Sequence, residues 1–276
     1  MKKTLFTGLI ISLIACNNNA GDSAKSTETD TSTMKETAAN EVKPPETSSE
    51  KTMGAGACAK MIFFQPGAEI DAVTYDEDGK LTSKQLTKIL SVTNEGGVTV
   101  ANVEGLDSVY GDPKSTSVKY SYKCDGNKIF FDIASMFRTE EKEKDASFES
   151  SLIEYPINVT AGETLPDAVG TMSSERDGKK MTLKYFYKDR KVEGKETITT
   201  TAGTWDCFKI SNSVEAEMDI PGMDEKTKEM MKKMKEGMKT TTTTWFSPDF
   251  GIVKMEMYMN GKLESRNEVT AVRKSK

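Results

Sequence analysis

Alternating polar and apolar residues dominate the chain from residue 68 onward. A period of two is typical of β-strands with one buried face. The pattern predicts twelve strands, over residues 68–76, 81–93, 97–104, 116–124, 128–135, 168–175, 180–189, 191–200, 203–216, 239–246, 251–259 and 262–273. Asp-Gly and Asn-Gly pairs between several of them favour tight hairpin turns. Because no long helix separates the strands, the sequence predicts an all-β domain, mainly an antiparallel meander, with one helix.

That helix is predicted over 223–239, where MDEKTKEMMKKMKEGMK follows Pro221 and Asp224 can cap its first turn. Four methionines fall on one face at helical spacing, with lysines opposite: Met230, Met231, Met234 and Met238. We expect this face to pack over the sheet. The alternatives are a lid over an apolar ligand, because methionine adapts to varied shapes, or a methionine-only copper site.

Tyr185 and Tyr187 occupy alternate positions in the strand at 180–189, so they share one face of it. The same pattern would line a sheet core or the wall of a cavity. We therefore name both tyrosines, with the four helix methionines, as candidates for lining an apolar ligand site.

Two segments of the domain, one near each end, have similar sequences. YDEDGKLTSK at 75–84 resembles YMNGKLESR at 258–266, and each precedes a strand. Two similar halves, about 57–137 and 165–276, would explain this similarity, as would two unrelated hairpins with the same turn chemistry. The charged run at 138–146 would link the halves as a loop or short helix.

The N-terminus reads MKKTLFTGLIISLIAC, in which two lysines precede an apolar run that is too short to span a bilayer. LIAC at 13–16 resembles the lipobox of bacterial lipoproteins. We expect residues 1–15 to be a signal peptide and Cys16 to carry acyl chains such as palmitate, which anchor the mature chain to a membrane. Asn17 is not the aspartate of inner-membrane retention, so the outer membrane is favoured.

Residues 16–56 are rich in Ser, Thr, Glu and Lys and contain almost no large apolar side chains, which predicts a disordered tether. The folded domain would then occupy 57–276. Without residues 1–15 the chain has 36 basic and 43 acidic residues, a net charge of −7, and nucleic acid is an unsuitable partner.

Three cysteines follow Cys16. Cys58 and Cys124 are candidates for a disulfide, and Cys207 is expected to be a buried free thiol. The chain has no histidine, which excludes Ser-His-Asp and Cys-His catalysis and histidine-ligated metals. No cysteine spacing suits zinc, and no motif implies a cofactor.

Two segments carry a family resemblance: GTWDCFKI at 203–210 and WFSPDFGIVK at 245–254, which a Gly-Lys-Leu hairpin follows. They resemble the TapB family of exported bacterial domains of unknown function. The resemblance covers roughly residues 57–273 and implies a clam-like half-barrel or open barrel, similar in outline to periplasmic lipoprotein carriers. It implies no established activity and no catalytic residues.

Taken together, the sequence predicts a lipid-anchored, non-enzymatic β domain of the cell envelope that binds an apolar ligand or a protein partner. The alternative is a structural lipoprotein of an envelope assembly without a small-molecule ligand. The aromatics at 245–250 fit either a binding surface or a structural corner, and we favour the corner.

Overall fold

The computed structural model describes residues 58–110, 115–132, 146–150, 152–176, 179–236 and 239–274. All of them belong to one compact unit, Thr52–Lys276. Cys16 and the predicted signal peptide and tether lie outside the described residues.

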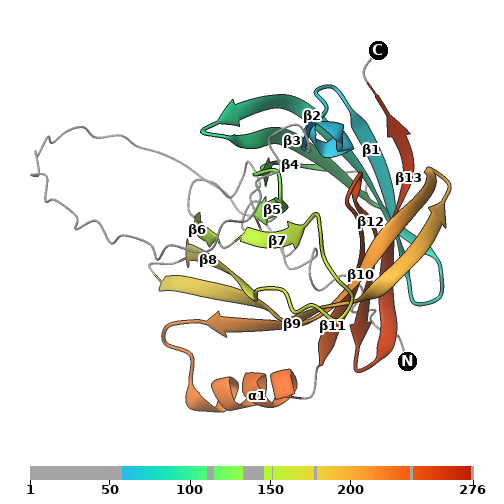
Figure 1. Ribbon diagram of the computed structural model, residues 1–276. Helices are drawn as coiled ribbons and strands as arrows, with labels where there is room; N and C mark the ends of the chain where they lie inside the picture. The colour runs from blue at the N-terminus through green and yellow to red at the C-terminus, as the bar shows by residue number, and fades with distance from the viewer. Residues whose placement is uncertain are drawn as a thin grey trace, which may run out of the picture. The chain divides into compact units, whose positions relative to one another are not determined.

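Thirteen antiparallel strands form a single sheet (Figure 1). They are β1 (Glu69–Asp76), β2 (Leu81–Glu95), β3 (Val98–Val109), β4 (Ser115–Cys124), β5 (Lys128–Asp132), β6 (Ala146–Ser150), β7 (Leu152–Pro156), β8 (Ala168–Arg176), β9 (Lys179–Thr200), β10 (Gly203–Asp219), β11 (Thr240–Ser247), β12 (Gly251–Met259) and β13 (Lys262–Arg273). The prediction of an all-β antiparallel fold is confirmed.

The order of the strands makes the sheet a nearly closed barrel. It runs β6-β8-β9-β10-β11-β12-β13-β1-β2-β3-β4-β5-β7, so β6 and β7 are the two edges. These edge strands are separated by a single residue in the sequence. The chain itself therefore brings the two edges of the curled sheet together.

The strands differ from the prediction in three places. The runs at 180–189 and 191–200 form one long strand, β9, in which Asp189 takes a positive φ of 53° instead of ending the strand. β3 continues five residues past the predicted end, to Val109. β6 and β7 were not predicted, because five-residue strands show too few alternations for a periodic signal.

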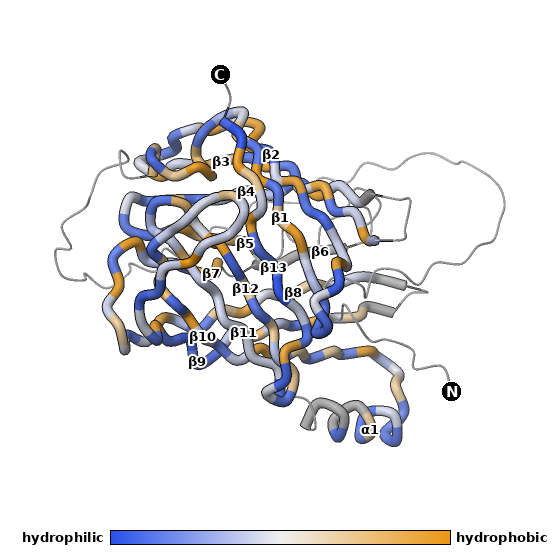
Figure 2. The backbone as a smooth tube through the Cα atoms, turned by 90° about the vertical axis from the view of Figure 1, so that its right-hand side faces the viewer, coloured by the Kyte–Doolittle hydropathy of each residue, from blue (hydrophilic) through white to orange (hydrophobic). Residues whose placement is uncertain are grey.

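Aromatic rings pack against one another across the interior of the barrel. A chain of ring contacts with centroids 4.8–5.2 Å apart leads from Phe63 through Tyr122, Phe131 and Tyr155 to Phe246. Tyr155 lies on β7 and Phe246 on β11, which are not neighbours in the sheet, so this contact crosses the interior. In Figure 2 orange and blue alternate along the strands, as one buried and one solvated face require.

Two short 3-10 helices, η1 (Cys58–Lys60) and η2 (Ile62–Phe64), supply part of this core. Met61, Ile62, Phe63 and Phe64 are all buried. A disulfide bond joins Cys58 to Cys124 at the end of β4, the pair that the sequence singled out. It fastens the helical segment to the sheet.

The α-helix of the described residues, α1 (Glu225–Glu236), connects β10 to β11 and projects from the end of the sheet (Figure 1). Asp224 caps it, since its Oδ1 accepts a hydrogen bond from the backbone N–H of Thr227 at 3.0 Å. The helix ends before the predicted residue 239. Met230 is 58 % exposed, so this methionine does not pack over the sheet as expected.

Candidate functional site

The predicted ligand-lining residues do not form one site in the described part of the chain. Tyr185 is buried and Tyr187 packs against the core, while Met230 is exposed on α1. Met231 and Met234 fall within α1, but their side chains lie outside the described set, as does Met238 altogether.

The two tyrosines belong to a buried cluster around Arg190. Burial raises the pKa of Tyr187 well above its usual range, with contributions from Tyr155 and Tyr185 that the Arg190 guanidinium partly opposes. Burial likewise raises the pKa of Tyr185. Both hydroxyls are therefore neutral at physiological pH and form part of the core.

Arg190 is 1 % exposed, and its charge is met by backbone carbonyls. Its Nη2 donates to the carbonyl of Glu154 on β7 at 2.7 Å, and its Nη1 donates to the carbonyl of Pro166, just before β8, at 2.8 Å. The guanidinium also lies 5.2 Å from the centre of the Tyr155 ring. Arg190 thus ties the edge strand β7 to β9 across the seam of the barrel.

The remaining thiol is not a nucleophile. Cys207 is free and buried, and burial raises the pKa of its thiol to about 12, with the carboxylates of Asp206 and Glu196 adding to the shift. At neutral pH it is protonated, and the thiol form is unreactive. Within the described ranges, no group of three or more His, Cys, Asp or Glu side chains could hold a metal ion.

The aromatics of the WFSPDFG segment form a structural corner. Phe250 is buried, with its ring centre 5.8 Å from Phe63 and 5.0 Å from Trp205. Trp245 is also buried. Its indole nitrogen donates to Glu196 at 2.7 Å, and the ammonium groups of Lys209 and Lys254 lie 5.5 and 4.3 Å from its ring centre. Neither aromatic is free to bind a ligand.

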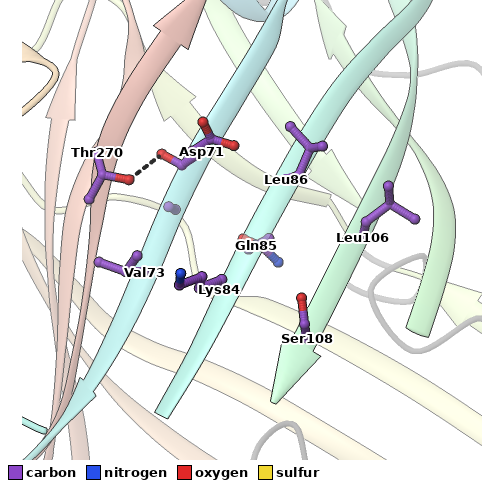
Figure 3. A pocket seen from close by; sticks show the side chains of 9 residues that line it. Asp71, Val73, Lys84, Gln85, Leu86, Leu106, Ser108 and Thr270 are labelled. Atoms are coloured by element: carbon purple, nitrogen blue, oxygen red, sulfur yellow. Dashed lines mark hydrogen bonds between the residues drawn. The ribbon is translucent and has the colours of Figure 1, made fainter. Parts of the chain in front are cut away.

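A shallow groove lies on the opposite side of the sheet from the core, on the outer face of β1, β2 and β3. We call it the β1–β3 groove; its volume is about 520 Å³ (Figure 3). It is lined by Asp71, Ala72, Val73, Lys84, Gln85, Leu86, Leu106, Ser108 and Thr270. No single motif marks these residues in the sequence, because they come from four strands, β13, β1, β2 and β3.

The alternation of side chains explains why apolar groups lie outside the barrel here. Ile70 and Ala72 on β1 are buried, so Asp71 and Val73 between and beyond them project to the other face. Leu86 and Leu106 are register partners on β2 and β3 and extend this outer face. Sequence alternation could have identified each residue, but only the register places Leu86 beside Leu106. On β1, Asp71 is the partner of Leu86, and Val73 lies two residues further along, opposite Lys84.

A second depression of about 210 Å³ continues the groove, and the two share Lys84 and Ser108. It adds Leu81, Val109 and Tyr110, of which Val109 is 51 % and Tyr110 70 % exposed. Val109 and Tyr110 are thus two of the exposed large apolar side chains among the described residues.

The polar groups of the groove are unevenly paired. The carboxylate of Asp71 is held by the guanidinium of Arg273 on β13, and the hydroxyl of Thr270 donates to the backbone carbonyl of Asp71 at 3.4 Å. Lys84 has no ion-pair partner in the part of the chain that the structure describes. The groove thus offers an apolar floor and one available ammonium group.

The fold and the groove define the class of protein: a curled antiparallel β domain with aromatic rings packed across its interior and a groove of mixed polar and apolar lining on its outer face. A family model described as DUF3108-like matches residues 65–269. The chain therefore belongs to the DUF3108-like family.

Two solved structures share the fold, each with a TM-score of 0.57. One, from Bacteroides fragilis NCTC 9343, is described as an exported protein with a YmcC-like fold; it is 19 % identical, and the match covers 77 % of this chain and 100 % of that one. The other, from Parabacteroides distasonis ATCC 8503, is described as a lipoprotein; it is 18 % identical, and the coverage is 77 % and 99 %. A comparison with curated proteins gave no match.

Proposed function

We propose that this chain is a lipid-anchored, non-enzymatic protein of the cell envelope that binds a protein partner in the β1–β3 groove. The observation that carries the proposal is the contrast between the two faces of the sheet. The ring chain from Phe63 to Phe246 packs across the interior, whereas Val73, Leu86 and Leu106 on the outer face are only half-buried. This contrast favours a protein partner over an apolar ligand held inside the barrel.

The proposed anchor is Cys16, exposed at the mature N-terminus once residues 1–15 are removed, with residues 16–56 as a tether. Two fold relatives described as exported and as a lipoprotein support this assignment. The outer membrane is favoured because Asn17 replaces the aspartate of inner-membrane retention.

The narrower grouping with the TapB family, based on the WFSPDFGIVK corner, is also a proposal. Among the described residues, no helix has the length and apolarity to cross a bilayer.

A non-enzymatic role is supported by the side chains that the chain offers. It has no histidine, and the Cys207 thiol is protonated and buried. The tyrosine hydroxyls near Arg190 are core groups whose pKa is raised by burial.

The chemistry of the groove indicates the partner. Val73, Leu86 and Leu106 would take apolar side chains, and an extended segment fits a depression that continues from one pocket into the next. Lys84 would pair with a carboxylate of the partner, since its ammonium group has no ion-pair partner among the described residues. We therefore expect a peptide segment that combines apolar residues with an acidic one.

Site-specific photo-crosslinking in the producing bacterium tests this function. A photoreactive residue at Leu86 or at Leu106 is expected to capture the same envelope protein, identified by mass spectrometry. The matched control is Lys184, an exposed position on β9 away from the groove. Capture of different proteins at the two groove positions, or equal capture at Lys184, would contradict a specific docking site.

A further inference from the structure

Three methionines alternate along β12, and their setting is unlike that of a packed core. Met255, Met257 and Met259 share one face of the strand, and we call them the Met row. Lys254, Glu256 and Tyr258 occupy the opposite face. Met255 is 38 % exposed, and the other two are half-buried.

Polar residues flank each methionine on both neighbouring strands. Met255 lies between Thr244 and Asn267 in register, and Met257 between Thr242 and Ser265. Met259 lies between Thr240 and Lys262. Thioethers in a core are normally surrounded by apolar side chains, whereas these have polar partners in register, and the Met255 end of the row is open to solvent.

Two of these polar neighbours form hydrogen bonds with other side chains. The Thr242 hydroxyl donates to Asn212 Oδ1 at 2.8 Å, and the Asn267 amide donates to the Thr74 hydroxyl at 3.0 Å. These hydrogen bonds fix the side chains of Thr242 and Asn267 beside the Met row and do not involve the methionine sulfur atoms.

We propose that the Met row binds a soft monovalent metal ion, Cu(I), through thioether sulfur. Soft thioether ligands select Cu(I) over harder divalent ions. Side chains two residues apart on a strand are about 6.6 Å apart at the backbone, and methionine has three rotatable bonds with which to converge on one ion. Met257 is the central ligand, since it can pair with either neighbour.

The competing soft ligands of the chain are the thirteen methionines outside the row and the thiol of Cys16, which the proposed acyl chains would block. The chain contains no histidine, and Cys58 and Cys124 are joined in a disulfide. Cys207 is 2 % exposed. Binding of a soft ion to the folded chain would therefore measure its binding to methionine thioethers.

Titration of the full chain, produced without a histidine tag, with Ag(I) tests the proposal; Ag(I) is a soft substitute for Cu(I) that avoids its oxidation in air. Calorimetry and native mass spectrometry are expected to show one silver ion per chain, with no comparable binding of Zn²⁺ or Cu²⁺. The M257L variant should weaken binding by more than about tenfold, equivalent to about 1.4 kcal/mol. M255L/M257L/M259L should abolish it, and because methionine-to-leucine changes conserve volume, the fold should survive.

Binding of silver should also be independent of pH between about 5 and 8, because a thioether has no proton to lose, unlike most metal ligands. C207A, M218L and the helix variant M230L/M231L/M234L/M238L are the controls, and each should bind silver as the wild type does. No silver bound by the wild type, unchanged binding by M255L/M257L/M259L, or loss of binding in C207A or the helix variant would overturn the proposal.

Discussion

Gly251 is the residue on which the corner between β11 and β12 depends. Its φ is +116°, a conformation that L side chains rarely adopt. A Cβ placed there would come within 2.3 Å of Cε2 of Phe63, which is itself buried among the core rings. Backbone conformation and the packing of the helical segment therefore both demand glycine at this position.

We expect G251A to destabilise the protein by about 3 kcal/mol or more, since it combines backbone strain with overpacking. Urea unfolding followed by tryptophan fluorescence measures the loss. G79A is the matched control: Gly79 also has a positive φ, of +79°, but its Cβ would meet open space, so we expect a loss of about 1 kcal/mol. Equal losses in the two variants would contradict the role given to Phe63.

Asp107 on β3 is expected to destabilise the folded state when its carboxyl is ionised. Its Oδ1 is buried without a hydrogen-bond partner among the described residues. Burial raises the pKa of its carboxyl, and a backbone hydrogen bond from Ser108 opposes that shift only in part. The folded state therefore binds this proton more tightly than the unfolded state does, and the contribution of Asp107 to stability falls as the pH rises above the unfolded value, about 3.9.

The D107N substitution removes this titration while keeping the shape of the side chain. We expect the variant to be more stable than the wild type at pH 7 and to lose that advantage at about pH 3, where Asp107 is protonated in both states. Urea midpoints of the two proteins, measured from pH 3 to 7, give the difference. A D107N protein that is less stable at pH 7, or an offset that does not change with pH, would show that burial does not penalise the carboxylate.

At the scale of elements, the seam between the edges of the sheet is closed by a side chain where strand pairing is absent. β7 pairs with β5 on one side, and on the other the buried Arg190 holds the carbonyls of Glu154 and Pro166. A single long side chain thereby supplies a hydrogen-bond donor to the carbonyl of Glu154 on the edge strand and to that of Pro166 before β8.

Replacing Arg190 with methionine keeps much of its length but leaves both carbonyls without their donor. We expect R190M to lower the free energy of unfolding by about 2–4 kcal/mol. Hydrogen exchange should also become faster in β7 than elsewhere in the sheet. R273M is the control, because Arg273 pairs with Glu69 and Asp71 but is 48 % exposed, and its loss should cost at most about 1 kcal/mol. Equal effects of the two substitutions would rule out the seam as a special contact.

Some elements of the fold could be predicted from the sequence, and others could not. Hairpins at Gly79 and Gly261 were predictable, because turns of this kind need positive φ, and both glycines have a φ of +79°. The long strand β9 was predicted as two, since Asp189 resembles a turn residue although pairing to β10 continues across it. β6 and β7 were missed because their place depends on distant partners, β8 and β5.

At the scale of the whole molecule, the candidate site was harder to predict than the fold. Val73, Leu86 and Leu106 are ordinary alternating residues in sequence, and only the register of three strands makes them a groove. The methionine helix was predicted to line a ligand site because its methionines form a pattern within one short segment. In contrast, a surface assembled from separate strands leaves no local pattern.

The whole molecule also depends on the bond between Cys58 and Cys124, which closes a loop of 66 residues and fastens η1 to β4. The chain-entropy model gives such a loop about 4 kcal/mol of stabilisation. We expect reduction with dithiothreitol to lower the urea midpoint of the wild type accordingly. The C58S/C124S variant should start from the lower midpoint and not respond to the reductant. A wild-type midpoint unchanged after thiol titration has confirmed reduction would contradict this role.

The central claim, that the β1–β3 groove is the binding surface, is tested most directly by affinity. Once crosslinking has identified the partner, its dissociation constant is measured by biolayer interferometry with the wild type, L86D/L106D, K84E and the control K184E. We predict that L86D/L106D weakens binding by more than about a hundredfold, because two apolar anchors are lost. K84E should mainly slow association at low salt, and K184E should change nothing. Binding by L86D/L106D as tight as that of the wild type would contradict the account.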